Sequence, residues 1–546
     1  MTQRPLPLFS TGTPPSSVEE VVAACVALGA LVTGGPLSPE EERLARQAPA
    51  YGGDVEGLRH AMQQGSDPLG DAYCALRPSS RRRALGAFYT PPSVVEPMVA
   101  WALSRSPGRV VDAGCGSGRF AAAAVRQDPT LEVVAVDVDP AATLVARAVL
   151  GAIGSQRARV VNADYLRVSL ARSSGLTAFV GNPPYVRHHD LGPETKAWAK
   201  RAAAEQGLPF SGLAGLHVYF LLATMKHARR GDVGCFVTSA EWLDVGYGKT
   251  LRAALLNGLG GESLHLVDAR AKAFDDALAT AVVACFEVGA RRKEMRLRRV
   301  SSAGLLGALD QGGSILPSGE LQAASRWTPL FSPSRRQASP GMVRLGDVVR
   351  VSRGVATGNN AFFVLSLDRA EALRLRRWCV PALTRAREVL EAPGTVHLGS
   401  DRKLLLDPPR GTDPTAEGNR ALREYLAEGR ALKVHEGYLC THRAPWWHVG
   451  AKAPPIVATY MARQAPAFAL NPDGLAVLNV FHGLYPKLPL TRVQLEGLVA
   501  YLNENRAALR GAGRTYQGGL EKFEPREMEA LLVPPPERLP EFARST

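Results

Sequence analysis

Three short apolar runs in the first third of the chain end in glycine or an acidic residue, and this pattern restricts the fold more than any other feature. The run Arg109–Ala113 leads into a glycine-rich segment. The runs 133–136 and 160–163 lead to Asp137 and Asp164. Apolar runs separated by helical patterns are typical of parallel strands joined by crossover helices. We therefore expect an α/β fold with a doubly wound, Rossmann-like sheet.

The residues at the ends of these runs indicate a ligand. Gly114, Gly116 and Gly118 would let the backbone approach a bound molecule closely, just before the amino end of a helix. Asp137, at the tip of the second strand, could accept hydrogen bonds from ribose hydroxyls. Taken singly, Asp137 or Asp164 is explained equally well as a helix N-cap. Together, the glycines and the acids predict a cofactor that carries a nucleoside.

The sequence Asn182-Pro183-Pro184-Tyr185 follows another apolar run. The two prolines end the strand, and Pro183 disfavours a helical backbone at Asn182. The Asn182 side-chain oxygen and the Pro183 carbonyl could then accept both N–H groups of an aromatic amine and aim its lone pair at an electrophile. Tyr185 could stack on the ring. For these four residues taken alone, a proline-rich turn with an Asx cap is the structural alternative.

Charge and cysteine content narrow the class of function. The 546 residues carry a formal net charge of +14, which favours a polyanion such as nucleic acid, although a basic, solvated surface gives the same charge. The seven cysteines form no Cys-x-x-Cys pair, so we expect neither a disulfide framework nor a metal site. We find no signal peptide and no apolar run long enough to span a membrane, and expect a cytoplasmic protein with no membrane partner.

Composition changes divide the chain into four segments. We predict a small helical region over residues 1–80 and the sheet domain over 81–290. Residues 291–340 are basic and then rich in Gly, Ser and Pro, which predicts a linker. Residues 341–546 combine short strand and helix patterns, which predicts a mixed α+β domain.

The last segment carries basic residues interleaved with aromatic ones. Examples are the stretches 350–363, 443–447 and 514–523. This combination suits contact with nucleic acid. The alternative for Trp446 and Trp447 is burial in a core.

The content and order of these motifs resemble the amino-group adenine DNA methyltransferases of the TaqI type, which have the gamma arrangement. In that family, a motif for the methionine end of the cofactor precedes the glycine-rich loop and the Asn-Pro-Pro-Tyr motif. A carboxyl-terminal recognition domain follows. The matching segments here are Tyr89–Pro92, Asp112–Phe120, Asp137, Asp164, Asn182–Tyr185 and Phe274–Val283.

The resemblance implies transfer of a methyl group from S-adenosyl-L-methionine to N6 of a flipped-out adenine in double-stranded DNA. It implies a methyltransferase domain over 81–290 and a DNA target-recognition domain over 341–546. It assigns catalysis to Asn182, Pro183, Tyr185 and Phe274, with Tyr185 and Phe274 on opposite faces of the base. It assigns cofactor binding to Tyr89, Thr90, Pro91, Asp112, Gly114, Gly116, Gly118, Asp137, Asp164 and Asn182, and it requires no metal.

Within that family we expect a monomeric bacterial modification methylase, whose partner in function is a restriction endonuclease for the same DNA sequence. Other readings remain open. Release-factor glutamine methyltransferases also use Asn-Pro-Pro-Tyr but lack a long recognition domain. An RNA adenine methyltransferase is a second alternative. A DNA-binding specificity protein with an inactive catalytic fold is the third, although intact Asp137, Asn182 and Tyr185 argue against it.

Overall fold

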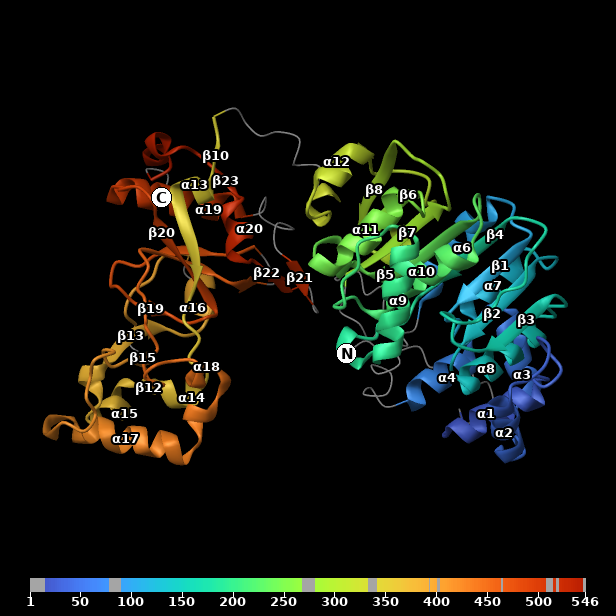
Figure 1. Cartoon of the computed structure of the whole chain (residues 1–546), viewed down its shortest axis with the longest axis horizontal. Coiled ribbons are helices and arrows are strands. Elements are labelled where there is room, and N and C mark those ends of the chain that lie inside the picture. The colour runs from blue at the N-terminus through green and yellow to red at the C-terminus, as the bar shows by residue number, and fades with distance from the viewer. Residues whose placement is uncertain are drawn as a thin grey trace. The chain divides into compact units, whose positions relative to one another are not determined.

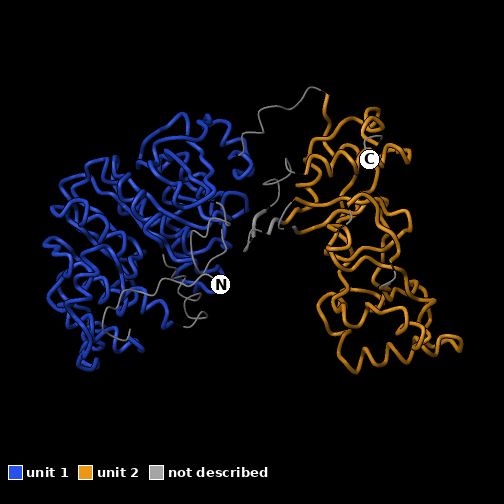
Figure 2. The backbone as a smooth tube through the Cα atoms, turned by 180° about the vertical axis from the view of Figure 1, so that it is seen from behind, with its two compact units in different colours: residues 1–333, 517–519 blue, residues 334–516, 520–546 orange. Residues whose placement is uncertain are grey.

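The computed structural model contains two compact units, one within residues 1–333 and the other within residues 334–546 (Figure 2). The structure describes residues 15–77, 90–267, 280–331, 341–391, 393–399, 403–462, 465–506, 514–516 and 520–543.

The first unit is built on a nine-stranded sheet with the strand order β3-β2-β1-β4-β5-β7-β6-β8-β9 (Figure 1). Strands β1 to β5 pair in parallel, and β7 runs antiparallel to both β5 and β6. The expected doubly wound α/β sheet is therefore confirmed. The strands are β1 (Arg109–Ala113), β2 (Glu132–Asp137), β3 (Ala158–Asn162), β4 (Thr177–Gly181), β5 (Val233–Ser239), β6 (Gly261–Val267), β7 (Ala281–Glu287), β8 (Glu294–Val300) and β9 (Ser314–Pro317).

Helices cover both faces of this sheet. Because successive side chains of a strand point to opposite faces, Val110 and Val111 of β1 enter different cores. Val110 packs with helices α6 and α7, and Val111 packs with α10 and α11. The helices on the two faces are α6 (Pro92–Leu103), α7 (Arg119–Gln127), α8 (Pro140–Ala152), α9 (Pro193–Glu205), α10 (Leu216–His227), α11 (Lys249–Leu256) and α12 (Ser318–Ala323).

The prediction of a linker over residues 291–340 is wrong for residues 291–331, which belong to the fold of the first unit. Strand β8 pairs in parallel with β6, and β9 pairs with β8. Met295 and Leu297 of β8 are buried in the core, whereas the arginines between and after them are more exposed. This alternation is that of a strand near the edge of a sheet. The density of basic residues hid it in the sequence.

The predicted helices before residue 80 are present as α1 (Val18–Ala27), α2 (Pro39–Gln47), α3 (Val55–Gln63) and α4 (Pro68–Leu76). They share a core with α8, in which Val21, Met62 and Leu69 pack with Leu144 and Val145. These helices therefore attach to the sheet through a packed apolar interface, and helices and sheet form one compact unit.

A buried ion pair lies in the same interface. The Arg147 Nε of α8 lies 2.8 Å from Glu41 Oε1 of α2, and both side chains are fully buried. The Arg147 guanidinium also donates to the carbonyls of Thr33, Gly35 and Pro36. A desolvated pair is tolerated only when hydrogen bonds satisfy its polar groups in this way.

The second unit is mixed α+β, as expected. A five-stranded sheet has the order β11-β20-β16-β18-β14, and a four-stranded sheet the order β12-β15-β13-β19. Its strands are β10 (Val343–Arg344), β11 (Val349–Arg353), β12 (Val364–Ser366), β13 (Cys379–Leu383), β14 (Gly394–Thr395), β15 (Lys403–Leu406), β16 (Ile456–Thr459), β17 (Met461–Ala462), β18 (Phe468–Leu470), β19 (Ala476–Val477), β20 (Phe481–Pro486), β21 (Arg514–Tyr516), β22 (Leu520–Lys522) and β23 (Leu532–Val533).

Helices contribute to three apolar cores among the described residues of the second unit. Trp447 is buried beside α17, and Trp446 packs against the same core, so the core interpretation of this pair is correct. The helices are α13 (Leu345–Val348), α14 (Asn360–Phe363), α15 (Leu367–Ala372), α16 (Arg387–Leu390), α17 (Arg420–Ala431), α18 (Tyr438–Thr441), α19 (Arg492–Glu504) and α20 (Pro525–Glu529). Among the helices that the structure describes, none is long and apolar enough to cross a membrane.

Candidate active site

A cavity of about 330 Å³ lies at the carboxyl ends of β1, β2, β3 and β4. Gly114 follows β1, Asp137 ends β2, Asp164 follows β3 and Asn182 follows β4, and all four line the cavity. This edge of a doubly wound sheet is where ligands bind. The volume is within the range of about 300–1,000 Å³ that is usual for small-molecule sites.

The glycine-rich loop forms one wall. Gly114, Gly116 and Gly118 have φ angles of 72°, 54° and 82°, in the left-handed region that disfavours other residues. A Cβ atom on Gly116 would meet no heavy atom within 4 Å, so the backbone at this position is open to a ligand. The Gly116 N–H donates to Asp137 Oδ2 at 2.8 Å, which ties the loop to the tip of β2.

Asp137 and Asp164 both lie at the cavity wall, as the sequence predicted. Burial raises the pKa of Asp137 to about 6, against the opposite effect of the Asp139 and Gly116 N–H groups. Asp164 is more accessible, and its Oδ1 accepts a hydrogen bond from the Leu166 N–H at 3.0 Å. Each carboxylate keeps lone pairs that a ligand hydroxyl or amine could use.

Some predicted cofactor residues do not reach the cavity wall. Asp112 is fully buried, and its Oδ2 accepts from the Ala121 N–H of α7 at 3.0 Å. Burial raises the pKa of Asp112 to about 7. Gly118 is the N-cap of α7, and Pro91 is the N-cap of α6. These three residues therefore shape the loop and the helix ends. Two other predicted residues, Tyr89 and Phe274, lie outside the described residues.

The Asn182 amide is held in one orientation. Its Nδ2 donates to the Thr90 hydroxyl at 3.0 Å, and Thr90 is buried. Its Oδ1 is buried and has no hydrogen-bond partner among the described residues. An unsatisfied buried acceptor costs free energy of about 1–3 kcal/mol. An acceptor left in this state next to a cavity is therefore a functional candidate.

Gly181 brings Asn182 close to β1. Its φ is 153°, and a Cβ atom there would lie 2.7 Å from the Ala113 carbonyl oxygen. Only glycine permits this approach of β4 to β1. The amide therefore lies beside the glycine-rich loop, where both line the same cavity.

Tyr185 is not among the residues that line the cavity, although Pro184 and Val186 are. It belongs to an aromatic group that the sequence did not predict. Its ring centroid is 6.3 Å from that of His217, which is 6.3 Å from that of Tyr247. His217 is buried, its Nε2 has no partner among the described residues, and burial lowers its pKa to about 4. The imidazole is therefore neutral. The sequence does not mark His217 as part of a site, because it is a lone histidine in the apolar pattern of α10.

The structure also places α4 at the cavity. Gly70, Tyr73, Cys74 and Arg77 all line it. Sequence reasoning gave residues 1–80 no part in the site, because nothing local in these residues indicates contact with a loop more than 30 positions further along the chain.

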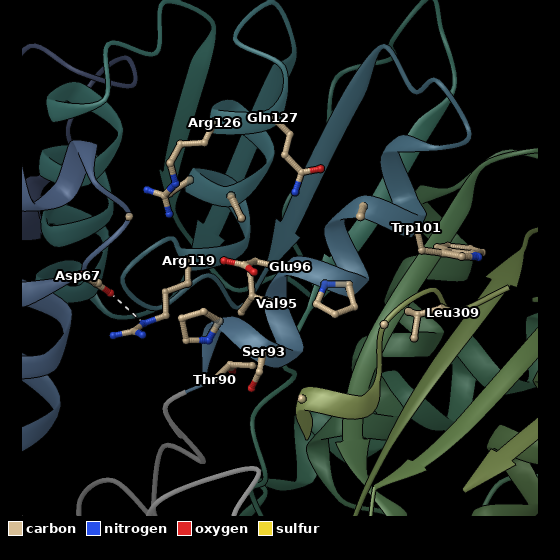
Figure 3. A pocket seen from close by; sticks show the side chains of 18 of the residues that line it. Asp67, Thr90, Ser93, Val95, Glu96, Trp101, Arg119, Arg126, Gln127 and Leu309 are labelled. Atoms are coloured by element: carbon tan, nitrogen blue, oxygen red, sulfur yellow. Dashed lines mark ion pairs between the residues drawn. The ribbon is translucent and has the colours of Figure 1, made fainter. Parts of the chain in front are cut away.

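A second, larger depression of about 1060 Å³ lies beside the first (Figure 3). It is bordered by α6, α7, the turn between α3 and α4, and residues 304–310. Thr90 and Arg119 line both cavities, but Asp137, Asp164 and Asn182 line only the smaller one. The smaller cavity is therefore the candidate active site. In the part of the chain that the structure describes, no three His, Cys, Asp or Glu side chains gather to hold a metal ion.

Three protein-family models match parts of the chain. Residues 334–545 match the family model for the C-terminal domain of Type II methyltransferase M.Eco57I. Residues 158–273 match the model for Eco57I restriction-modification methylase, and residues 98–208 the methyltransferase small domain.

Two curated relatives and two solved structures extend the match. The chain is 40% identical to Type II methyltransferase M.XamI of Xanthomonas campestris pv. amaranthicola, over 95% of this chain and 98% of that protein. It is 22% identical to Type II methyltransferase M.AccI of Acinetobacter calcoaceticus, over 83% of this chain and 86% of that protein. The fold resembles the Type IIL restriction-modification enzyme MmeI, with a TM-score of 0.54, 12% identity and coverage of 92% and 78%. It also resembles the DrdV–DNA complex structure, with a TM-score of 0.52, 12% identity and coverage of 96% of this chain and 66% of that chain.

Proposed function

The chain belongs to the Type II restriction–modification methyltransferases, the family of its 40% identical relative M.XamI, and from this premise we propose that it methylates N6 of adenine at a specific sequence in double-stranded DNA. Its methyl donor in this proposal is S-adenosyl-L-methionine. The observation that carries the proposal is the Asn182 amide, which Thr90 orients and whose buried oxygen at the cavity wall has no hydrogen-bond partner among the described residues.

The cavity suits such a cofactor. The acidic tips of β2 and β3 offer Asp137 to ribose hydroxyls and Asp164 to an adenine amino group. The open backbone at Gly116 gives room for close approach, and the neighbouring loop ends at the amino end of α7. When bound, the cofactor supplies a methyl group on a positively charged sulfur, which is already a strong electrophile.

The chemical task of the protein is to activate a weak nucleophile. The lone pair of an exocyclic amine is delocalised into its ring, so the nitrogen must become tetrahedral before it attacks. Asn182 Oδ1 and the Pro183 carbonyl would accept its two N–H groups and stabilise the positive charge that develops on the nitrogen. Acceptors fixed in advance need no reorganisation during the reaction. The nitrogen would take the methyl group as the sulfur–methyl bond breaks, which leaves S-adenosyl-L-homocysteine. It would then release one proton to solvent, so that the product is N6-methyladenine.

The target base must leave the DNA helix before it can reach Asn182. Extrusion costs a few kcal/mol, and stacking on aromatic side chains returns about 1–3 kcal/mol per base. We assign this stacking to Tyr185, with Phe274 on the other face of the base. A fluorescent adenine analogue at the target position tests the assignment. In the complex with Tyr185→Ala, the emission of the analogue should fall towards its value when stacked in free DNA. Emission equal to that of the wild-type complex would refute the assignment.

The second unit is proposed to read the DNA sequence. It carries exposed arginines beside aromatic rings, such as Arg353, whose guanidinium carbon lies 4.2 Å from the centroid of Tyr460. Such residues contact phosphates and bases. The protein is proposed to act as a monomer in the bacterial cytoplasm. It would protect DNA from a restriction endonuclease for the same sequence, with no stable complex required.

Expression in a methylation-free host tests the whole proposal. Sequencing of the host DNA should reveal N6-methyladenine in one defined sequence context. Asn182→Ala should abolish the mark, and the control Asn257→Ala, at an exposed position at the end of α11, should preserve it. Methylation of cytosine alone, or an equal adenine signal in Asn182→Ala, would overturn the proposal.

A further inference from the structure

Helix α4 lies along the candidate cofactor cavity, although it comes from the helical region that precedes every recognised motif. Gly70, Tyr73, Cys74 and Arg77 are part of the cavity wall. Each end of the helix is fastened to a different part of that wall, and the two attachments together define its role.

The first attachment is at Asp67, the N-cap of α4. Its carboxylate accepts from the Gly70 N–H at 2.9 Å and from the Ser117 hydroxyl of the glycine-rich loop at 2.6 Å. It also pairs with Arg119 Nε at 2.9 Å (Figure 3). The start of α4 is thus held on the loop and the first residue of α7.

The second attachment is at Asp139, the N-cap of α8. The Tyr73 hydroxyl donates to Asp139 Oδ2 at 2.7 Å, and the Arg77 guanidinium pairs with the same oxygen. Arg77 also lies over the Tyr73 ring, 4.4 Å from its centroid. The Arg77 and Asp139 side chains are 11% and 14% exposed, so water screens this pair only weakly.

Asp139 is directly connected to the carboxylate that we assign to the ribose. The Asp139 N–H donates to Asp137 Oδ1 at 2.9 Å. The two carboxylates lie close together, and the Asp139 charge opposes ionisation of Asp137, whereas Arg77 favours it. Arg77 therefore acts on Asp137 in two ways, by holding the turn 137–139 in place and by compensating its charge.

We propose that α4 completes the cofactor site, with Arg77 and Tyr73 as positioning residues that act through Asp139 to present Asp137 as an ionised acceptor. This inference rests on the proposed function, because it takes the cavity as the site for S-adenosylmethionine. It gives the amino-terminal helices a direct part in cofactor affinity.

Calorimetric binding of S-adenosylmethionine to the full chain tests the inference. Arg77→Ala should weaken binding about tenfold, which corresponds to about 1.4 kcal/mol. Arg77→Lys should recover part of the loss because it keeps the charge, and Tyr73→Phe should cause a smaller loss. The matched control is Arg46→Ala in α2, whose side chain is 74% exposed and pairs only with Glu42 among the ion pairs described. It should bind like the wild type.

The pH dependence of binding separates positioning from a general loss of structure. The charged and titratable groups around Asp137 are Asp139, Arg77 and Tyr73 on its outer side and Asp112 and Cys115 beneath the loop. The Asp139 and Gly116 N–H groups and the Arg77 charge all lower the Asp137 pKa, and removal of Arg77 takes away the last of these effects. The loss of affinity in Arg77→Ala should therefore be greater at mildly acidic than at mildly alkaline pH.

Each outcome decides the matter. Wild-type affinity in Arg77→Ala, or an equal loss in Arg46→Ala, overturns the inference but leaves the proposed function intact. Absence of binding by the wild type overturns both. Thermal melting without cofactor checks folding. Should Arg77→Ala fail to melt cooperatively, Tyr73→Phe and Arg77→Lys carry the test, and wild-type affinity in both overturns the inference.

Discussion

The Thr90 hydroxyl oxygen lies 3.0 Å from the Asn182 side-chain nitrogen, and this contact fixes the orientation of the amide. Thr90 comes immediately before the turn that starts α6, 92 positions earlier in the chain, and it also lines the cavity. A residue expected to bind the cofactor thus also orients the proposed catalytic acceptor. The same hydroxyl links the start of α6 to the end of β4, because Thr90 lies just before α6 and Asn182 just after β4.

Thr90→Val should slow methyl transfer with little change in folding. The valine keeps the volume but leaves the Asn182 nitrogen without its acceptor, so the amide can rotate and lose its preferred orientation. One hydrogen bond contributes about 0.5–1.5 kcal/mol, which predicts a loss of about two- to tenfold in single-turnover rate at saturating cofactor. Thr90→Ser, which keeps the hydroxyl, is the control. Equal rates in the valine and serine variants would contradict the orienting role.

Asp137→Ala should weaken cofactor binding at least about tenfold, the effect of losing about 1.4 kcal/mol, and should leave DNA affinity nearly unchanged. Its carboxylate lies at the cavity wall and is the proposed acceptor for ribose hydroxyls. Calorimetry with cofactor and a gel-shift titration with DNA separate the two effects. Asp128→Ala offers a control, because Asp128 ends α7 and bonds to Thr130 away from the cavity. A parallel loss of both affinities would point to misfolding instead.

Much of the cavity was predictable because its residues lie at strand ends. The sequence places Gly114, Asp137, Asp164 and Asn182 directly after apolar runs, and parallel strands bring their carboxyl ends to one edge. The pattern does not reveal which side chains turn inward. Asp112 belongs to the same motif, yet its carboxylate faces the backbone of α7, because the pleat of β1 alternates its side chains between the two faces.

Other parts of the site depend on tertiary packing. Tyr73 and Asp139 are 66 positions apart, and only the apolar interface of the amino-terminal helices with α8 brings them together. The linker prediction failed at β8 for a related reason. A strand near a sheet edge can carry arginines on its accessible side, and local composition then suggests a loop although its pairing partner is β6.

The buried carboxyl of Asp112 should make the stability of the protein depend on pH. Its pKa is about 7 in the folded protein because of burial, against about 3.9 when unfolded. Because the folded pKa is the higher one, its contribution is fully present below about pH 4 and is lost as the pH rises through about 7. The free energy of unfolding should therefore fall more between about pH 5 and pH 8 in the wild type than in Asp112→Asn. Parallel pH profiles in denaturant titrations would exclude this role.

Glu41→Ala should destabilise the first unit by about 3–5 kcal/mol, since it leaves the Arg147 charge buried without its partner. Glu42→Ala is a close control: Glu42 lies next in the same helix, is 50% exposed and pairs with Arg46 at the surface, so it should change stability by less than about 1 kcal/mol. Urea unfolding of the full chain checks both. A small effect of Glu41→Ala would mean that the carbonyls around Arg147 are sufficient to hold its charge.

The proposed division of labour, with cofactor binding in the first unit and DNA recognition in the second, predicts different fates for two truncated chains. A chain ending after residue 300 loses β9, whose Leu316 is buried against the core of the sheet, and also α12 and Trp327, which is buried in that core. It should be insoluble or lack a cooperative unfolding transition.

A chain ending after residue 333 keeps all nine strands of the described sheet and should bind S-adenosylmethionine with affinity close to that of the full protein. It should lose sequence-specific DNA binding, because the exposed arginines of the second unit are gone. The DNA affinity of the full chain should fall steeply with salt, as phosphate contacts require. If the chain ending at 333 methylates the same sequence as the full protein, recognition resides in the first unit and the second unit has another role.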